Sequence, residues 1–106
     1  VFDDADLDRA LPFLINAGIQ NAGQTCSASS RILIHSKVYK EVSNLMRQRY
    51  ESLQVGAALN DLDVGPLISK RQKDLVNSFI RSGDDLEKLA EGQLSQNVSA
   101  PIEPPT

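Results

Sequence analysis

Apolar residues recur every three or four positions in three separate stretches of the chain, which is the spacing of one face of an α-helix. These stretches predict helices near 7–19, 37–55 and 70–82. In the last of them, the apolar face that we expect to be buried consists of Leu75, Val76, Phe79 and Ile80. Charged residues occupy the opposite faces, which is typical of helices that pack on one side against a core.

Each predicted helix is preceded by a residue that can cap its N-terminus. Asp6 and Ser36 stand directly before the first two helices, and oxygens of such side chains accept hydrogen bonds from the free N–H groups of a first turn. Ser69 and Gln72 have the spacing of a capping box, in which the serine hydroxyl accepts from the Gln72 backbone and the Gln72 side chain reaches back to the cap. These caps support the three helices independently of the apolar pattern.

Residues 31–35 contain three consecutive apolar residues in a run too short for a helix. Such a run predicts a strand that is covered on both faces, as in a parallel sheet. We also expect strands at the two chain ends, whereas residues 84–92 fit either a short helix or a strand. Residues 93–106 are polar and rich in proline, which predicts a mobile loop leading into a truncated strand. Helices combined with buried parallel strands indicate an α/β fold.

The chain has 106 residues, with 11 basic and 14 acidic side chains and a net charge of −3. This length provides one domain with one modest core. The near balance of charge offers no basic face for nucleic acid or anionic lipid, and no apolar run is long enough to span a membrane. The single cysteine permits no internal disulfide, which fits a reducing compartment. Because the sequence also shows no secretory signal, we expect a cytoplasmic location.

The only cysteine, Cys26, lies where the first predicted helix must turn into the predicted strand. Gly23 lets the backbone bend there, and the small residues 27–30 leave room beside the sulfur. A thiol on such a turn can attack a carbonyl carbon while its own backbone N–H points toward the oxygen that becomes negative. A lone cysteine can equally be a small buried hydrophobic residue, so the turn by itself leaves both interpretations open.

Three other sites that the sequence suggests are disfavoured by their context. Residues 18–25 have the glycine spacing of a P-loop, but Gln24 replaces the phosphate-binding lysine, and a helix precedes the loop in place of a strand. His35 is the only histidine, and its position along the predicted strand puts it too far from Cys26 to act as its base, so we expect a surface histidine. One cysteine and one histidine at this spacing do not make a metal site.

Residues 21–31, Asn-Ala-Gly-Gln-Thr-Cys-Ser-Ala-Ser-Ser-Arg, closely resemble the active-site cysteine segment of the aldehyde dehydrogenase superfamily. Residues 1–8 are similar to the acidic lead into that family's preceding helix. Residues 64–68, Val-Gly-Pro-Leu-Ile, look like its Gly-Pro turn, and residues 104–106 resemble the start of its following Pro-Thr strand. These separated motifs stand in the family's order, so the resemblance covers most of the chain.

The resemblance implies that residues 1–106 are part of an aldehyde dehydrogenase catalytic domain, with a three-layer, Rossmann-like parallel sheet. It implies that Cys26 is the nucleophile in the oxidation of an aldehyde to a carboxylic acid, through a thiohemiacetal and a thioester. It also implies that Gln72 helps to hold a ribose of the cofactor, NAD or NADP. The parent enzyme is then expected to be a homo-oligomer.

The family's general-base glutamate, its oxyanion-binding asparagine and its dinucleotide-binding domain have no counterpart in these residues. The chain also begins without methionine and ends on an extended proline-rich segment, so we expect it to be a piece of a longer protein. On its own it is then expected to be inactive. The alternative interpretation is a non-catalytic packing or oligomer-interface module whose cysteine is incidental.

Overall fold

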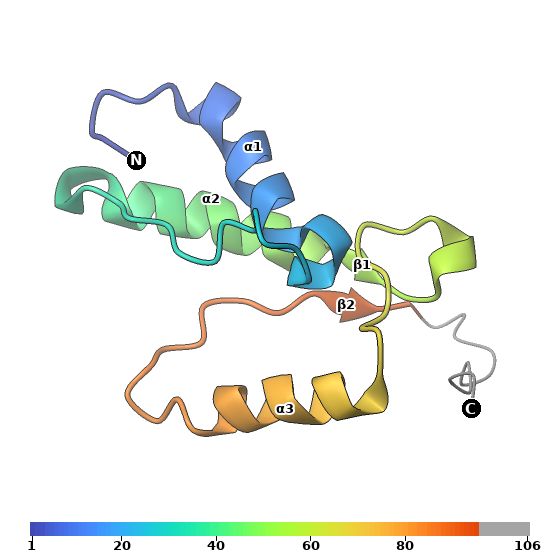
Figure 1. The fold of residues 1–106 in the computed structure, drawn as a ribbon. Coiled ribbons are helices and arrows are strands. Elements are labelled where there is room, and N and C mark those ends of the chain that lie inside the picture. The colour runs from blue at the N-terminus through green and yellow to red at the C-terminus, as the bar shows by residue number, and fades with distance from the viewer. Residues whose placement is uncertain (96–106) are drawn as a thin grey trace.

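The structure of the chain, a computed structural model, describes residues 1–95. The first predicted helix is confirmed over its whole length, and the third ends one residue earlier than predicted. In chain order the elements are the helix α1 (Leu7–Ile19), the 3-10 turns η1 (Gln20–Gly23) and η2 (Ser36–Val38), the helix α2 (Tyr39–Ser52), the strand β1 (Gln54–Val55), the 3-10 turn η3 (Ala58–Asn60), the helix α3 (Lys70–Arg81) and the strand β2 (Gln93–Leu94), as Figure 1 shows.

The core lies between α1 and α2, whose apolar faces pack on each other. Ile15 from α1 and Val42 and Met46 from α2 are buried at its centre. Burying an aliphatic side chain of this size stabilises a fold by about 1.5–3 kcal/mol. The half-buried residues packed around the centre are Val1, Leu7, Ile19, Ile32, Ile34, Val38 and Tyr50. The spacing of apolar residues in the sequence therefore identified the faces that form this core.

The two strands pair in parallel, which confirms the predicted parallel sheet but places it elsewhere in the chain. Gln54 lies opposite Gln93 and Val55 opposite Leu94. The backbone N–H of Gln93 donates to the Leu53 carbonyl at 2.9 Å. Because the backbone just after Ser52 joins this sheet, the second helix ends there and not at residue 55 as predicted. The first two residues of the segment predicted as a mobile loop form β2, and residues 96–106 of that prediction lie outside the described residues.

The predicted strand at residues 31–35 is absent from the sheet, and this prediction was wrong in its burial as well. Leu33 is 84% exposed, while its neighbours Ile32 and Ile34 are half-buried against the core. Within the described residues, the backbone of this stretch has one distant partner, Val1: the nitrogen of Val1 donates to the Leu33 carbonyl at 2.6 Å, and the N–H of His35 donates to the Val1 carbonyl at 2.9 Å. The His35 carbonyl also accepts locally from the N–H of Val38 at 3.1 Å. One paired residue is too little to form a strand, so Val1 contributes none at the N-terminal end either.

The predicted caps at Asp6 and Ser69 are confirmed, whereas the cap at Ser36 is wrong. The Asp6 carboxylate accepts from the backbone N–H of Arg9 at 3.2 Å. At the second helix the cap is His35, whose Nδ1 accepts from the backbone N–H of Lys37 at 3.3 Å, and Ser36 is the first residue of η2. The extra 3-10 turn before α2 moves the capping position one residue toward the N-terminus.

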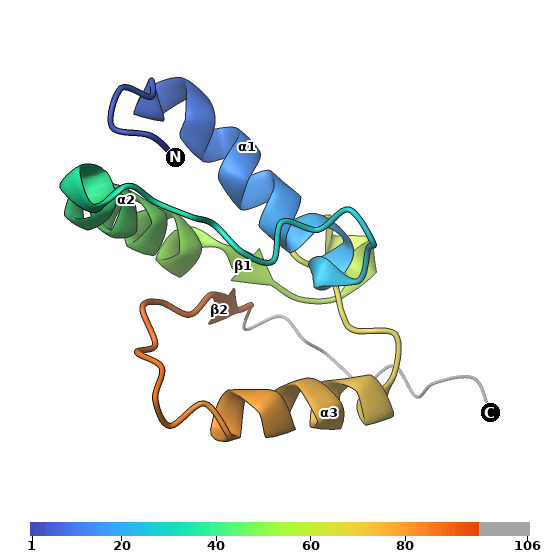
Figure 2. The same cartoon turned by 60° about the vertical axis from the view of Figure 1, so that its left-hand side comes forward.

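Helix α3 is amphipathic, but its apolar face is not buried, contrary to the prediction. Leu75, Phe79 and Ile80 are 48%, 69% and 66% exposed. Figures 1 and 2 show the reason, because the strand pair separates α3 from the α1–α2 pair. No other helix within residues 1–95 covers this face, and residues 84–92 form neither helix nor strand.

Candidate functional site

The chain reverses direction directly after α1 through three consecutive residues in the left-handed region. Asn21 has φ 50°, Ala22 has φ 56° and Gly23 has φ 76°. Glycine and asparagine adopt this conformation readily, whereas for an alanine it costs roughly 1–2 kcal/mol. The turn is therefore strained at Ala22 and needs interactions that hold it in place.

A reciprocal set of hydrogen bonds between Asn21 and Gln24 holds this turn. The carbonyl of Asn21 accepts from the backbone N–H of Gln24 at 3.1 Å and from its side-chain Nε2 at 3.0 Å. In return, Nδ2 of Asn21 donates to the Gln24 carbonyl at 3.2 Å. Net contributions of about 0.5–1.5 kcal/mol per hydrogen bond are enough to offset the strain at one alanine.

Cys26 follows at once, at the second position of a tight turn. The carbonyl of Thr25 accepts from the N–H of Ala28 at 3.1 Å, and the N–H of Ser29 ties the turn back to α1 by donating to the Ala17 carbonyl at 3.0 Å. The Cys26 side chain is exposed, and its backbone N–H makes no hydrogen bond within the described part of the chain. The sulfur and an unbonded N–H donor therefore lie together on a turn that hydrogen bonds hold in place. This exposure distinguishes Cys26 from a small buried hydrophobic residue.

The side chain of Gln24 also reaches a second segment. Its Oε1 accepts from the backbone N–H of Ile68 at 2.9 Å, across 44 positions of sequence. Ile68 directly precedes Ser69, the cap of α3. The sequence drew attention to Gln24 only because it stands where a P-loop has lysine. The position of Gln24 close to Cys26 was visible in the sequence. Its hydrogen bond to Ile68 could not be predicted, because the two residues lie far apart in the chain.

Gln72 lies in the first turn of α3 and forms only half of the predicted capping box. Its backbone N–H donates to the Ser69 hydroxyl at 3.1 Å, as expected. Its side chain, however, makes no hydrogen bond to the cap or to any other residue from 1 to 95. The half-buried Gln72 carboxamide is therefore available to an outside partner. The structure does not bring Gln72 into hydrogen-bond contact with Cys26, and the segments that carry them are joined through Gln24.

The other candidates from the sequence do not gather around Cys26. His35 is exposed, as predicted, and its Nδ1 is engaged at the start of η2. Among the residues that the structure describes, no group of three or more His, Cys, Asp or Glu side chains could hold a metal ion. No helix in the same part of the chain is long and apolar enough to cross a membrane.

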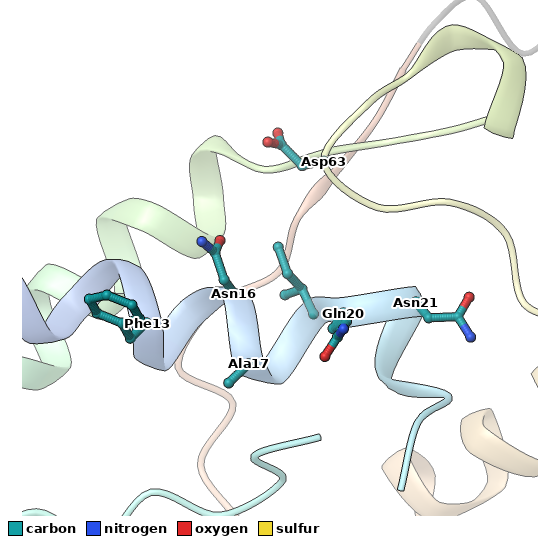
Figure 3. Close-up of a pocket in the computed structure, with 7 residues that line it drawn as sticks. Phe13, Asn16, Ala17, Gln20, Asn21 and Asp63 are labelled. Atoms are coloured by element: carbon teal, nitrogen blue, oxygen red, sulfur yellow. The ribbon is translucent and has the colours of Figure 1, made fainter. Parts of the chain in front are cut away.

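An open hollow of about 470 Å³ lies beside the C-terminal half of α1 and the turn η1. Figure 3 shows its lining side chains, which come from the helix and its extension, with Asp63 contributed from the loop after η3. The Asp63 carboxylate is already engaged, because it accepts from the backbone N–H of Gln54 at 2.9 Å. Neither Cys26 nor Gln72 lines this hollow, although Asn21 of the cysteine turn does.

Comparison with known proteins gives one consistent result. The "Putative aldehyde dehydrogenase DhaS" of Bacillus subtilis is 45% identical over 83 residues, which is 77% of this chain and 17% of that protein. "Aldehyde dehydrogenase [NAD(P)+] 2" of Saccharomyces cerevisiae is 37% identical over 101 residues, which is 91% of this chain and 20% of that protein. The crystal structure of a "Putative Aldehyde Dehydrogenase" from Burkholderia cenocepacia matches with a TM-score of 0.90 and 43% identity over 92% of this chain and 21% of that one.

The chain thus spans about a fifth of the length of the relatives that it matches. The structural match, together with the helices and parallel strand pair, confirms the α/β fold. The model of the aldehyde dehydrogenase family matches residues 1–104, which is nearly the whole sequence. On these grounds, the chain belongs to the aldehyde dehydrogenase family.

Proposed function

We propose that this chain is part of the catalytic domain of a longer enzyme, here called the parent enzyme, that oxidises an aldehyde to a carboxylic acid with NAD(P)+ as acceptor. The observation that carries the proposal is the placement of Cys26. Its exposed thiol lies beside a free backbone N–H, on a turn that hydrogen bonds hold on both sides of the cysteine. Membership of the aldehyde dehydrogenase family supports the reaction class. The yeast relative, whose name specifies NAD(P)+, supports the acceptor.

In the first step, the Cys26 thiolate attacks the carbonyl carbon of the aldehyde. A C–S bond forms, and the electron pair of the C=O double bond moves to the oxygen, which becomes a negatively charged thiohemiacetal oxygen. The free N–H of Cys26 is a ready hydrogen-bond donor for that oxygen. The left-handed turn before the cysteine fixes the direction in which this N–H points, so the donor is in place before the charge develops.

In the second step, the oxyanion re-forms its C=O bond and the hydride leaves the same carbon, which converts the thiohemiacetal into a thioester on Cys26. Bound NAD(P)+ supplies the acceptor for this hydride. Water then adds to the thioester carbon and the Cys26 thiolate leaves, which releases the carboxylic acid and restores the nucleophile. We propose that the base for this water lies outside residues 1–106, so that the chain alone is inactive.

Gln72 is suited to bind the cofactor because its carboxamide is half-buried and has no hydrogen-bond partner within residues 1–95. A carboxamide offers both a donor and an acceptor, which matches two adjacent ribose hydroxyls. The start of α3 would fix this side chain, since Ser69 holds the Gln72 backbone. In this proposal Gln72 binds and orients, while Cys26 performs the chemistry.

The alternative of a packing module with an incidental cysteine requires an unreactive sulfur, and the exposure of Cys26 argues against it. Cys26→Ala in the parent enzyme decides between them. We expect aldehyde-dependent NAD(P)H formation, followed by absorbance, to be lost, because alanine has no nucleophile that could form the thiohemiacetal. Ser36→Ala, an exposed change outside the cysteine turn, is the matched control and should retain activity. Normal turnover by the Cys26→Ala enzyme would reject the proposal.

A further inference from the structure

We infer that Gln24 is a positioning residue that sets the Cys26 turn in register with the N-terminus of α3, an inference that rests on the proposed function. Both Nε2 and Oε1 of its carboxamide form hydrogen bonds. Nε2 donates to the Asn21 carbonyl at 3.0 Å, inside the turn, and Oε1 accepts from the Ile68 N–H at 2.9 Å, next to the cap of α3. Gln24 thereby joins the segment that carries the nucleophile to the segment that carries Gln72.

This link is isolated. Within residues 1–95, no other hydrogen bond or ion pair connects residues 65–92 to the rest of the chain. Helix α3 also buries no residue, so apolar packing does not fix its place beside α1 and α2. The pairing of β2 with β1 anchors the C-terminal end of the segment, and a bridge between Val64 and Val55 anchors its N-terminal end. The Gln24–Ile68 hydrogen bond is what ties the N-terminus of the helix to the cysteine turn.

The two partners require a carboxamide. The Asn21 carbonyl needs a donor and the Ile68 N–H needs an acceptor, and glutamine supplies both from one side chain. Glutamate at position 24 keeps the acceptor for Ile68 but has no donor for Asn21. Methionine has nearly the same length and replaces neither group. The pair of substitutions therefore separates the link to α3 from the hydrogen bond inside the turn.

The consequence for the proposed reaction is geometric. The carbon bound to Cys26 must face the cofactor while Gln72 holds a ribose, so the two segments must be in register during hydride transfer. A displacement of about 1 Å at a reacting centre costs on the order of 100-fold in rate. Loss of the link should thus lower kcat, while the intrinsic reactivity of the exposed Cys26 thiol and the affinity for NAD(P)+ change little.

The test compares Gln24→Met, Gln24→Glu and the exposed control Gln48→Met in the parent enzyme. We expect Gln24→Met to lower kcat about 10- to 100-fold. In the same variant, the alkylation rate of Cys26 by iodoacetamide and the dissociation constant of NAD(P)+ should stay within about threefold. Gln24→Glu keeps the Ile68 acceptor and should retain most of kcat, as should Gln48→Met. Unfolding midpoints of the three variants show that each is folded.

Two results would overturn the inference while leaving the proposed function intact: a kcat in Gln24→Met equal to that of the wild type, or a loss in Gln24→Glu as large as in Gln24→Met. If Gln24→Met does not fold, Gln24→Glu decides alone, because a folded Gln24→Glu enzyme with a lost kcat contradicts a role through Ile68. A wild-type parent enzyme without aldehyde-dependent NAD(P)H formation would reject the proposed function, and this inference with it.

Discussion

The hydroxyl of Ser69 accepts a hydrogen bond from the backbone N–H of Gln72 at 3.1 Å, while the Gln72 carboxamide makes no hydrogen bond within residues 1–95. A cap partner that used its side chain would not be free to bind a ligand. Capping of α3 at Ser69 therefore does not engage the Gln72 side chain. Its backbone serves the helix, and its side chain remains available.

From this relationship we predict that Gln72→Met in the parent enzyme raises the KM for NAD(P)+ about 3- to 30-fold, since one or two hydrogen bonds of about 0.5–1.5 kcal/mol would be lost. The KM for the aldehyde should not change. Steady-state kinetics with each substrate varied in turn measure both values. Gln48→Met, on the exposed side of α2, is the control. An unchanged KM for NAD(P)+ would remove Gln72 from the cofactor site.

Cys26 is predicted to react rapidly with iodoacetamide in the parent enzyme, because its side chain is exposed on a turn. Saturating aldehyde should slow the reaction at least about tenfold by occupying the sulfur, and NAD(P)+ should change its rate. Mass spectrometry of the peptide that contains Cys26 measures the extent of alkylation over time. A sulfur that stays unmodified with and without ligands would support the packing module instead.

Ala22→Gly is predicted to stabilise the parent enzyme by up to about 1 kcal/mol, because glycine adopts the φ of 56° without the strain that alanine bears. Ala17→Gly, the same substitution inside α1, should destabilise it by about 1 kcal/mol. Thermal unfolding midpoints of the two variants, measured side by side, show which substitution stabilises the enzyme and which destabilises it. If Ala22→Gly lowers the midpoint as much as Ala17→Gly does, the turn is not strained at this position.

A pH effect is predicted at Asp3, where the ammonium group of Lys37 lies 3.0 Å from the carboxylate and its hydrogen bond lowers the Asp3 pKa. A lowered carboxyl pKa contributes stability that is present above the ordinary aspartate pKa of about 3.9 and is lost as the pH falls through the lowered value. Lys37→Met should move the Asp3 pKa back toward its ordinary value.

An NMR titration of the Asp3 carboxyl carbon in the 106-residue chain measures this pKa directly. Lys40→Met is the matched control, since Lys40 is exposed and forms no ion pair within residues 1–95. The Lys37 side chain is 73% exposed and that of Asp3 39%, so solvent screens the pair and the effect on overall stability is expected to be small. Identical titration curves for the two lysine variants would contradict the ion pair.

Much of the helical part of the fold could be predicted because its signals are local. The span of α1 follows from apolar spacing and from the cap at Asp6, and the buried positions Val42 and Met46 follow from the same spacing in α2. The sheet could not be placed in this way. The run at 31–35 has the composition of a strand, but its only distant backbone partner within residues 1–95 is Val1. Gln93 and Leu94 pair with β1 and form a strand.

The apolar face of α3 also shows that a local sequence pattern does not identify distant contacts. Its spacing correctly predicted an amphipathic helix, but the predicted burial of the apolar face is wrong, because burial requires a covering surface and none is present within residues 1–95. We expect the parent enzyme to provide that surface. Periodicity identifies which side chains share a face of a helix, and it does not identify what lies against that face.

The sequence by itself determined the span of α1 and, to within one residue, that of α3, the helix caps at Asp6 and Ser69, and the family motif that marks Cys26. Each of these depends on residues a few positions apart, whose geometry is set by the backbone between them. The tertiary structure alone decided that Gln24 bonds to Ile68 and that β1 pairs with β2. Such contacts join groups that lie tens of residues apart. Any exposed N–H could donate the same bond and any exposed carbonyl could accept it, so only the packed chain selects the partner.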